Sequence, residues 1–277
     1  MKIKFYGTAA AEGIPALFCD CYICRYAREH RGKDVKTRSQ ALVDGKILID
    51  FPADTYMHML YGGLDLKSIR TLIITHGHAD HLYERDFWCR SRGIANDIPE
   101  NEPLNVYVAE SGYEHSKLFI DEKMKDTNRV VLHKIEPFVA FDAEGYTITP
   151  LAADHDQKSS PVIYIIEKDG KRLLYAHDTG IFPEKSWQYL SEYKKSFDFV
   201  SIDCTSMLLK GYNRHHLGLD GDVMVIDRLR NLGLIDSNTK IYANHFSHNG
   251  RATHDELVTA ASEYGFGVTY DGLEVEF

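Results

Sequence analysis

Long apolar runs are missing from this chain of 277 residues, and the longest uninterrupted ones, such as residues 162–166, span about five residues. A membrane-spanning helix needs about 20 consecutive apolar residues, so we expect no membrane-spanning segment and no membrane partner. Near the N-terminus, Glu12 interrupts the apolar stretch that a signal peptide would require. We therefore expect a cytoplasmic protein.

Positive charge is also scarce, because 32 Lys and Arg stand against 41 Asp and Glu, a formal net charge of −9. A sequence-independent grip on long nucleic acid rests on clustered cations that neutralise phosphates, so we expect no such partner. A small phosphorylated substrate is compatible with this charge if a metal site supplies local positive charge. The oligomeric state is left open, with a homodimer as one option.

Cysteines are few and odd in number, and the five present do not form the framework of a secreted disulfide-rich domain. Three of them, Cys19, Cys21 and Cys24, lie within six residues. A cluster this tight indicates a metal site. Cys89 and Cys204 lack such neighbours and are interpreted as packing residues.

The apolar share of 44% and the charged share of 26% are those of an ordinary globular chain. No segment has the composition of a linker, so we expect one domain over residues 1–277. Helical periodicity predicts helices over 183–195, 221–232 and 253–264, the last with a capping-box pattern at Thr253 and Glu256. Short β-rich runs predict strands over 2–6, 41–43, 46–50, 71–75, 105–108, 130–134, 146–150, 162–167, 172–176, 197–202, 241–243 and 273–277.

Two of these strand pairs are joined by Asp44-Gly45 and Asp169-Gly170, both typical of tight hairpins. Hairpins and helices mixed along the chain predict an α/β or α+β domain with much antiparallel pairing. Residues 87–103 are poor in pattern and are interpreted as a long loop over the active site.

The chemistry concentrates where the strand over 71–75 runs into His76-Gly77-His78-Ala79-Asp80-His81. At a strand end the chain turns, so alternate side chains can converge on one point. Imidazole and carboxylate groups are good ligands for zinc, iron and manganese. Composition alone would produce this pattern far less than once in such a chain, so it predicts a metal centre.

At this motif the chain resembles the metallo-β-lactamase superfamily, whose hydrolases carry H-x-H-x-D-H after a strand. The resemblance implies an αββα sandwich, an α/β fold of two mixed sheets flanked by helices. It also implies that one metal takes His76, His78 and His155, that the other takes Asp80, His81 and His245, and that Asp178 bridges them. We count Asp80 among the catalytic residues as well.

The same resemblance suggests that Asp50 orients ligands, although a role as an ordinary turn residue is equally open. His177 precedes the bridging carboxylate, but alternation along a strand turns its side chain away from that of Asp178. Two metals about 3.5–4 Å apart can hold a hydroxide between them and bind phosphoryl oxygens or polarise an acyl carbonyl. The motif does not choose between phosphorus and carbon.

The cysteine cluster offers three thiolates, one fewer than a closed tetrahedral zinc site needs. His248, three residues after His245, is the fourth ligand that we expect for this structural zinc. Together with Gly7-Thr8, the C-x-C-x2-C cluster and the hydrolase ligands, this pattern resembles the PhnP-type phosphoribosyl cyclic phosphodiesterases. That resemblance implies hydrolysis of a small cyclic phosphodiester such as 5-phosphoribosyl 1,2-cyclic phosphate, with zinc, manganese or iron in the active site.

In such enzymes a histidine between the bridging aspartate and the last ligand protonates the leaving oxygen, and the matching segment here is 212–218. We assign this role to His216, with His215 as the rival, because imidazole titrates near neutral pH. Arg214 is open between binding a substrate phosphate and being a solvated charge.

Three other functions compete. One is another hydrolysis within the superfamily, of a thioester or lactone or at a tRNA 3′ end. Another is a non-hydrolytic relative such as the pyrroloquinoline quinone biosynthesis protein, which also carries C-x-C-x2-C. The last is a zinc-stabilised binding module, although a closed structural site needs only four ligands.

Overall fold

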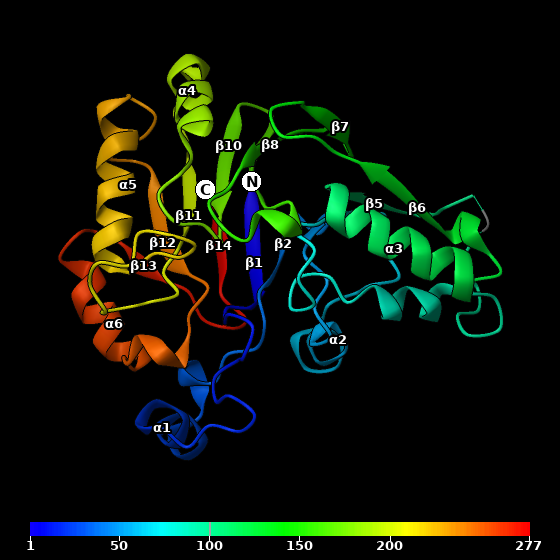
Figure 1. The fold of residues 1–277 in the computed structure, drawn as a ribbon, viewed down its shortest axis with the longest axis horizontal. Coiled ribbons are helices and arrows are strands. Elements are labelled where there is room, and N and C mark those ends of the chain that lie inside the picture. The colour runs from blue at the N-terminus through cyan, green and yellow to red at the C-terminus, as the bar shows by residue number, and fades with distance from the viewer. Residues whose placement is uncertain (100) are drawn as a thin grey trace.

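In a computed structural model that describes residues 1–99 and 101–277, the chain forms two seven-stranded sheets packed face to face between helices (Figure 1). One sheet has the order β14-β1-β2-β3-β4-β5-β6, and the other has the order β13-β12-β11-β10-β9-β8-β7. Both sheets mix parallel and antiparallel neighbours. The predicted αββα sandwich is confirmed.

The strands are β1 (Lys2–Gly7), β2 (Gln40–Val43), β3 (Ile47–Ile49), β4 (Thr71–Ile73), β5 (Leu104–Val108), β6 (Val130–Lys134), β7 (Phe141–Ala143), β8 (Tyr146–Ala152), β9 (Val162–Lys168), β10 (Lys171–Ala176), β11 (Phe199–Asp203), β12 (Lys240–Asn244), β13 (Gly267–Val268) and β14 (Glu274–Glu276). The helices are α1 (Tyr22–His30), α2 (Thr55–Gly62), α3 (Glu110–Lys123), α4 (Glu184–Tyr193), α5 (Leu219–Asn231) and α6 (His254–Ser262), with a 3-10 helix, η2, at Glu84–Arg90.

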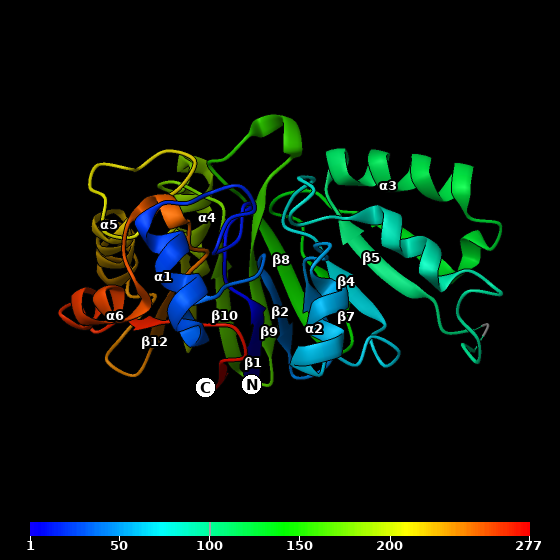
Figure 2. The same ribbon diagram turned by 90° about the horizontal axis from the view of Figure 1, so that it is seen from below.

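Three apolar clusters hold the layers together. The inner faces of the two sheets meet through buried side chains such as Phe5, Ile49, Tyr164 and Phe199. The β13–β7 sheet packs its outer face on α4, α5 and α6, while the other sheet packs on α2, α3 and η2 (Figures 1 and 2). Each sheet is therefore buried on both faces, which explains why many strands are apolar throughout rather than alternating.

Local sequence signals account for much of this arrangement. Asp44 and Gly45 have φ angles of 48° and 70°, as the primed hairpin turn requires, and Asp169 and Gly170 repeat the pattern. Thr253 and Glu256 form the predicted capping box at the start of α6. All twelve predicted strands exist with small shifts of their ends, and β7 and β13 are additional.

Three helices, α1, α2 and α3, were not predicted. The buried positions of α3 are Gly112, Ser116 and Ile120, so two of its three inward residues are not apolar. The hydrophobic periodicity that reveals a helix in a sequence is therefore missing there.

In the segment 87–103, the described residues after residue 90 form the expected loop, with neither helix nor strand, but the predicted position of this segment over the active site is wrong. Residue 100 lies outside the described residues. The first residues of the segment belong to η2, and Phe87, Cys89 and Ala95 line an apolar cavity next to β3 and β4. None of the segment's described residues lines the cavity beside the histidine cluster. Among the described residues, no helix has the length and apolarity needed to cross a lipid bilayer.

Gly7, at the irregular end of β1, tests how tightly the sheet is packed. A Cβ at this position would lie 1.9 Å from the carbonyl oxygen of Arg38, and that oxygen belongs to rigid backbone. We expect Gly7→Ala to lower the free energy of unfolding by about 1–3 kcal/mol or more. The control Lys46→Ala, in an exposed turn, should change the free energy of unfolding by less than about 0.5 kcal/mol. Both variants are measured by urea denaturation. Equal midpoints for the two variants would contradict this packing.

Candidate metal centre

The candidate site lies where parallel strands of both sheets end. His76 follows β4, Asp178 follows β10 and His245 follows β12. In one sheet β4 runs parallel to β3, and in the other β10, β11 and β12 run parallel to one another. Carboxyl ends of parallel strands share one edge, which is where α/β folds place their ligands.

Three histidines form the first group of possible ligands. The Nε2 atom of His76 lies 2.9 Å from Nδ1 of His78, which lies 3.2 Å from Nε2 of His155. Nitrogen ligands of a tetrahedral zinc ion, bound at about 2.0–2.1 Å, are about 3.3 Å apart. The three rings therefore present their nitrogen atoms at a spacing that suits a single ion.

The second group consists of Asp80, His81, Asp178 and His245. The Oδ2 atom of Asp178 lies 2.6 Å from Nε2 of His81 and 3.2 Å from Nε2 of His245. Asp80 contributes its Oδ2 atom, 3.3 Å from Nε2 of His81. Since the same Asp178 oxygen lies 3.6 Å from Nε2 of His76, this carboxylate joins the two groups. All seven sequence-predicted positions are thus brought together.

Hydrogen bonds hold the rings in the orientation that this requires. Oδ2 of Asp50 lies 2.7 Å from Nδ1 of His81, so Nε2 of that ring is left to face the carboxylates. Oγ1 of Thr205 lies 2.8 Å from Nδ1 of His245 and does the same for it. Such contacts fix the tautomer of a ligating histidine. Of the two roles open for Asp50, the orienting one matches this contact.

Asp203 is a site residue that the sequence reasoning missed. Its fully buried carboxylate accepts hydrogen bonds from the backbone N–H groups of Asp178 and Leu217, each at 2.9 Å. It thereby ties the bridging aspartate to the segment that carries His216. The available signal was an aspartate directly after a predicted strand, over residues 197–202.

Three residues of the site adopt left-handed backbone, with φ angles of 65° at Asp50, 51° at Asp178 and 65° at His245. Residues other than glycine adopt this region at a cost, which is repaid only where the surroundings fix it. Each of the three comes one or two positions after a parallel strand. The turn re-aims the side chain from the sheet face toward the common edge.

The electrostatics suit a centre for cations. Burial raises the pKa of Asp178, but His245 and His81 outweigh it and hold that pKa well below its usual range. Burial lowers the pKa of His76 well below the usual value, with His81 adding to the effect. At neutral pH the carboxylate is therefore ionised and the His76 ring is neutral, two states in which these groups bind a metal. Burial lowers the pKa of His81 and of His245, but the neighbouring aspartates outweigh it, raising that of His81 well above its usual value and that of His245 to about 9.

His216 lies at the same carboxylate, with Nδ1 3.2 Å from Oδ1 of Asp178 and 3.6 Å from Oδ2 of Asp203. Burial lowers its pKa, yet these two aspartates raise it overall to about 10. His215 is not among the residues that line the adjacent cavity, and its carbonyl oxygen lies 3.2 Å from Nδ1 of His155. Arg214 pairs with Asp154 through contacts of 2.7 and 3.1 Å.

His177 points away from the centre, as strand alternation predicts. Its Nε2 atom lies 2.7 Å from Oγ of Ser201, and the amide of Asn244 lies 3.2 Å from the same ring atom. The ring is fully buried between strands β10, β11 and β12.

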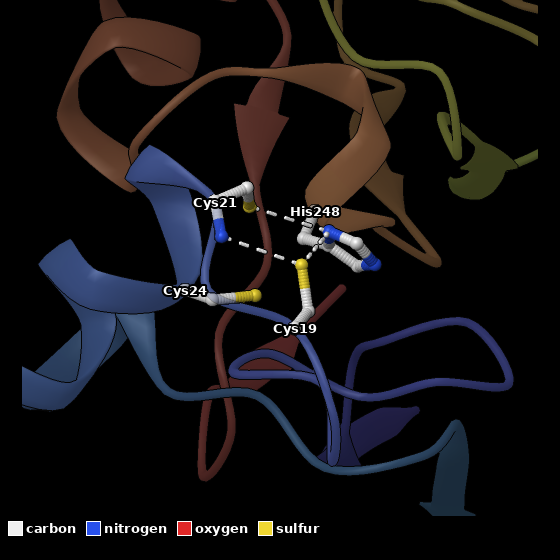
Figure 3. Close-up of side chains that lie close together, drawn as sticks. All are labelled: Cys19, Cys21, Cys24 and His248. Atoms are coloured by element: carbon white, nitrogen blue, oxygen red, sulfur yellow. Dashed lines mark hydrogen bonds between the residues drawn. The ribbon is translucent and has the colours of Figure 1, made fainter.

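The cysteine cluster forms a separate group, shown in Figure 3, in which the three thiols face His248. Nδ1 of His248 lies 3.6 Å from Sγ of Cys19 and 3.5 Å from Sγ of Cys21. Partial burial raises the pKa of Cys21, but hydrogen bonds from the Cys24 backbone and from His248 lower it to about 6. A thiolate at neutral pH next to a histidine fits a tetrahedral zinc site.

A cavity of about 350 Å³ opens beside both metal groups. It is lined by Ala10, Ala11, Glu12, His78, Asp80, His155, Asp178, Thr205, Ser206, Leu209, Tyr212, His216, His245, Ser247, Asn249 and Gly250. Its size suits a small molecule.

Comparison with known proteins places the chain in a family. The model of the beta-lactamase superfamily domain matches residues 46–237, a stretch that includes His76, Asp178 and His216 but not the cysteine cluster or His245. An octanoyltransferase of Porphyromonas gingivalis is 24% identical over 99% of this chain. The match covers 51% of that protein, so the chain spans about half the length of this curated relative.

Solved structures show the same fold. A diphosphatase of the PhnP family is 23% identical with a TM-score of 0.74, and the match covers 100% of this chain and 98% of the other. Zinc-bound PqqB from Methylobacterium extorquens is 19% identical with a TM-score of 0.76, and the match covers both chains fully. With more than half of its length matched by the family model, the chain belongs to the beta-lactamase superfamily and has the metallo-β-lactamase fold.

Proposed function

We propose that the protein is a metal-dependent phosphodiesterase that hydrolyses a small cyclic phosphodiester. The observation that carries the proposal is the position of Asp178, whose Oδ2 atom joins two ligand groups while its Oδ1 atom faces His216. A dinuclear centre with an imidazole beside it provides both charge stabilisation and a proton donor. Likeness to a PhnP-family diphosphatase supports phosphoryl rather than acyl chemistry.

In this proposal His76, His78 and His155 would hold one divalent ion, Asp80, His81 and His245 would hold the other, and Asp178 would serve both. Zinc, manganese and iron all suit these donors. Zinc suits the separate cluster of Cys19, Cys21, Cys24 and His248. Two ions at such a site supply Lewis acidity and neutralise charge on phosphoryl oxygens.

Other residues of the chain orient the ligand rings and supply a proton donor. Asp50 and Thr205 keep the rings of His81 and His245 turned toward the carboxylates. The Nδ1 atom of His216 faces Asp178, so Nε2 is the ring nitrogen that is left for substrate. From there the imidazole donates a proton to the departing sugar oxygen, which is a poor leaving group without one.

Acyl hydrolysis is the second candidate, and the match to an octanoyltransferase favours it. However, that activity can reside in the half of the relative that this chain does not cover. The cavity beside the ligands offers an acyl chain little aliphatic surface beyond Ala10, Ala11 and Leu209. The apolar cavity of about 290 Å³, next to Leu48, Phe51 and Phe87, shares no lining residue with it.

The deciding experiment measures hydrolysis of bis(p-nitrophenyl) phosphate, a 2′,3′-cyclic nucleotide, a ribose 1,2-cyclic phosphate and p-nitrophenyl octanoate. Each is tested with Mn²⁺, with Zn²⁺ and with a chelator. Chelator-sensitive turnover of the diesters, strongest on the cyclic ribose, supports the proposal. Turnover of the octanoate alone would replace it with acyl hydrolysis.

Asp80→Ala removes one carboxylate from the second ligand group. We expect diesterase turnover to fall by about 100-fold or more and the bound metal to decrease, since even residues behind the ligands cost 10–100-fold when they are lost. Far-UV circular dichroism should stay unchanged. Asp65→Asn, on an exposed loop, is the matched control and should retain full turnover. Normal turnover of Asp80→Ala would refute the dinuclear assignment.

His216→Ala tests the proton donor. Because p-nitrophenolate leaves without a proton, turnover of bis(p-nitrophenyl) phosphate should change only a few-fold, whereas turnover of the cyclic ribose should fall by about 100-fold or more. His215→Asn, which keeps a residue tolerant of the φ angle of 66°, is the control. Equal losses on the two substrates would remove His216 from this role.

Cys21→Ser tests the structural zinc. We expect the variant to lose about one zinc per chain and several degrees of thermal stability, because binding to a preformed cluster adds to the folding free energy. Cys89→Ser, at an exposed cysteine outside the cluster, should keep both. Unchanged zinc content in Cys21→Ser, measured by plasma emission, would argue against the site.

A further inference from the structure

The wall of the cavity that faces the metal groups carries negative rather than positive charge. Apart from the predicted ligands and His216, Glu12 is the only Asp, Glu or His among the described residues that line the cavity. None of these lining residues is Lys or Arg. The other polar side chains of this wall bear hydroxyls or an amide, and they are Thr205, Ser206, Tyr212, Ser247 and Asn249.

Two arginines that adjoin residues of this wall, Arg38 and Arg214, are engaged in ion pairs. Arg38 donates from Nε to the carbonyl oxygen of Ala11 at 2.7 Å, and its guanidinium pairs with Asp54 at 2.8 Å. Arg214 makes a two-point ion pair with Asp154. The cavity therefore lacks the fork of N–H donors that proteins usually aim at a phosphate monoester.

Glu12 is held in place rather than free to swing away. Its Oε1 atom accepts a hydrogen bond from Oγ of Ser247, and Nδ2 of Asn249 lies 3.4 Å from the same oxygen. Nε2 of His248, whose other ring nitrogen faces the cysteine cluster, lies 3.6 Å from it. The contacts described for Glu12 all engage Oε1, so Oε2 is the oxygen that is left to accept a hydrogen bond from a ligand.

Building on the proposed phosphodiesterase activity, we infer that Glu12 is a specificity-determining residue and that the substrate part facing it is an uncharged, hydroxyl-bearing group. A sugar hydroxyl can donate its proton to the carboxylate and accept from Asn249. A phosphate monoester at the same place is mostly a dianion at neutral pH, so it is a poor donor to the carboxylate and is repelled by its like charge. The favoured substrate is thus a cyclic phosphate of a sugar without a second phosphate.

The test compares ribose 1,2-cyclic phosphate with its 5-phosphorylated counterpart, using the metal-loaded protein. We expect kcat/KM to be at least about tenfold higher for the unphosphorylated sugar, a modest effect of a single repelled charge. Glu12→Gln keeps the shape of the side chain and removes its charge. We therefore expect kcat/KM to rise about tenfold for the 5-phosphorylated substrate and to fall for ribose 1,2-cyclic phosphate. Glu263→Gln, an exposed residue after α6, makes the same change in net charge and should leave the ratio unaltered.

Salt gives a second readout. Screening of the repulsion should raise kcat/KM for the 5-phosphate in the unmodified protein as ionic strength increases, and Glu12→Gln should lose most of this dependence. Zinc content of Glu12→Gln is measured alongside, because Glu12 also faces His248. A change in the substrate ratio with zinc retained assigns the effect to the cavity wall.

Two results overturn the inference. One is a preference of the unmodified protein for the 5-phosphate, and the other is an equal substrate ratio in Glu12→Gln and in the unmodified protein. Both leave diesterase turnover of bis(p-nitrophenyl) phosphate in place, so the proposed function survives them. Absence of turnover on every diester, bis(p-nitrophenyl) phosphate included, rejects the proposed function and the inference with it.

Discussion

The Asp178 carboxylate is the constraint around which the rest of the site is arranged. It is 3% exposed, and its oxygens lie within 3.6 Å of four imidazole rings rather than beside a Lys or Arg. Burying an ionised carboxylate is costly unless a positive charge compensates it. Protonated imidazoles can do so, and cations bound between the rings would compensate the same charge. The sheets deliver these rings to one carboxylate from the segments that follow β4, β11 and β12.

The two halves of the sandwich meet functionally at that edge. The β14–β6 sheet supplies His76 and the residues that follow it, and the β13–β7 sheet supplies His155, Asp178 and His245. The apolar layer between the sheets fixes their relative position, because packed interiors deform little. Left-handed residues at Asp50, Asp178 and His245 then turn side chains toward the edge. Left-handed backbone and core packing thus together hold the histidines and aspartates of the site close to one another.

The sequence revealed the parts of this site whose signals are local. His76, His78, Asp80 and His81 lie within six residues, and the cysteines are equally close together, so spacing alone exposes them. His155, Asp178 and His245 needed a family resemblance to be found, because single residues after strands are common. Asp203 and Glu12 were missed since their roles come from contacts with residues that are distant in sequence, Leu217 for one and Ser247 for the other. Helix α3 was missed because Gly112 and Ser116 occupy its buried face.

The cysteine cluster and the cavity are connected through residues 247–249, which contact both. Residues 247–249 follow His245, and within them His248 faces the thiols while Ser247 and Asn249 contact Glu12. Glu12 itself lies seven residues before Cys19, on the same N-terminal segment. A metal held by the cluster would clamp this segment to the loop after β12, and so fix the Glu12 carboxylate in the wall of the cavity. The cysteine cluster would in this way determine where the Glu12 charge lies relative to a bound substrate.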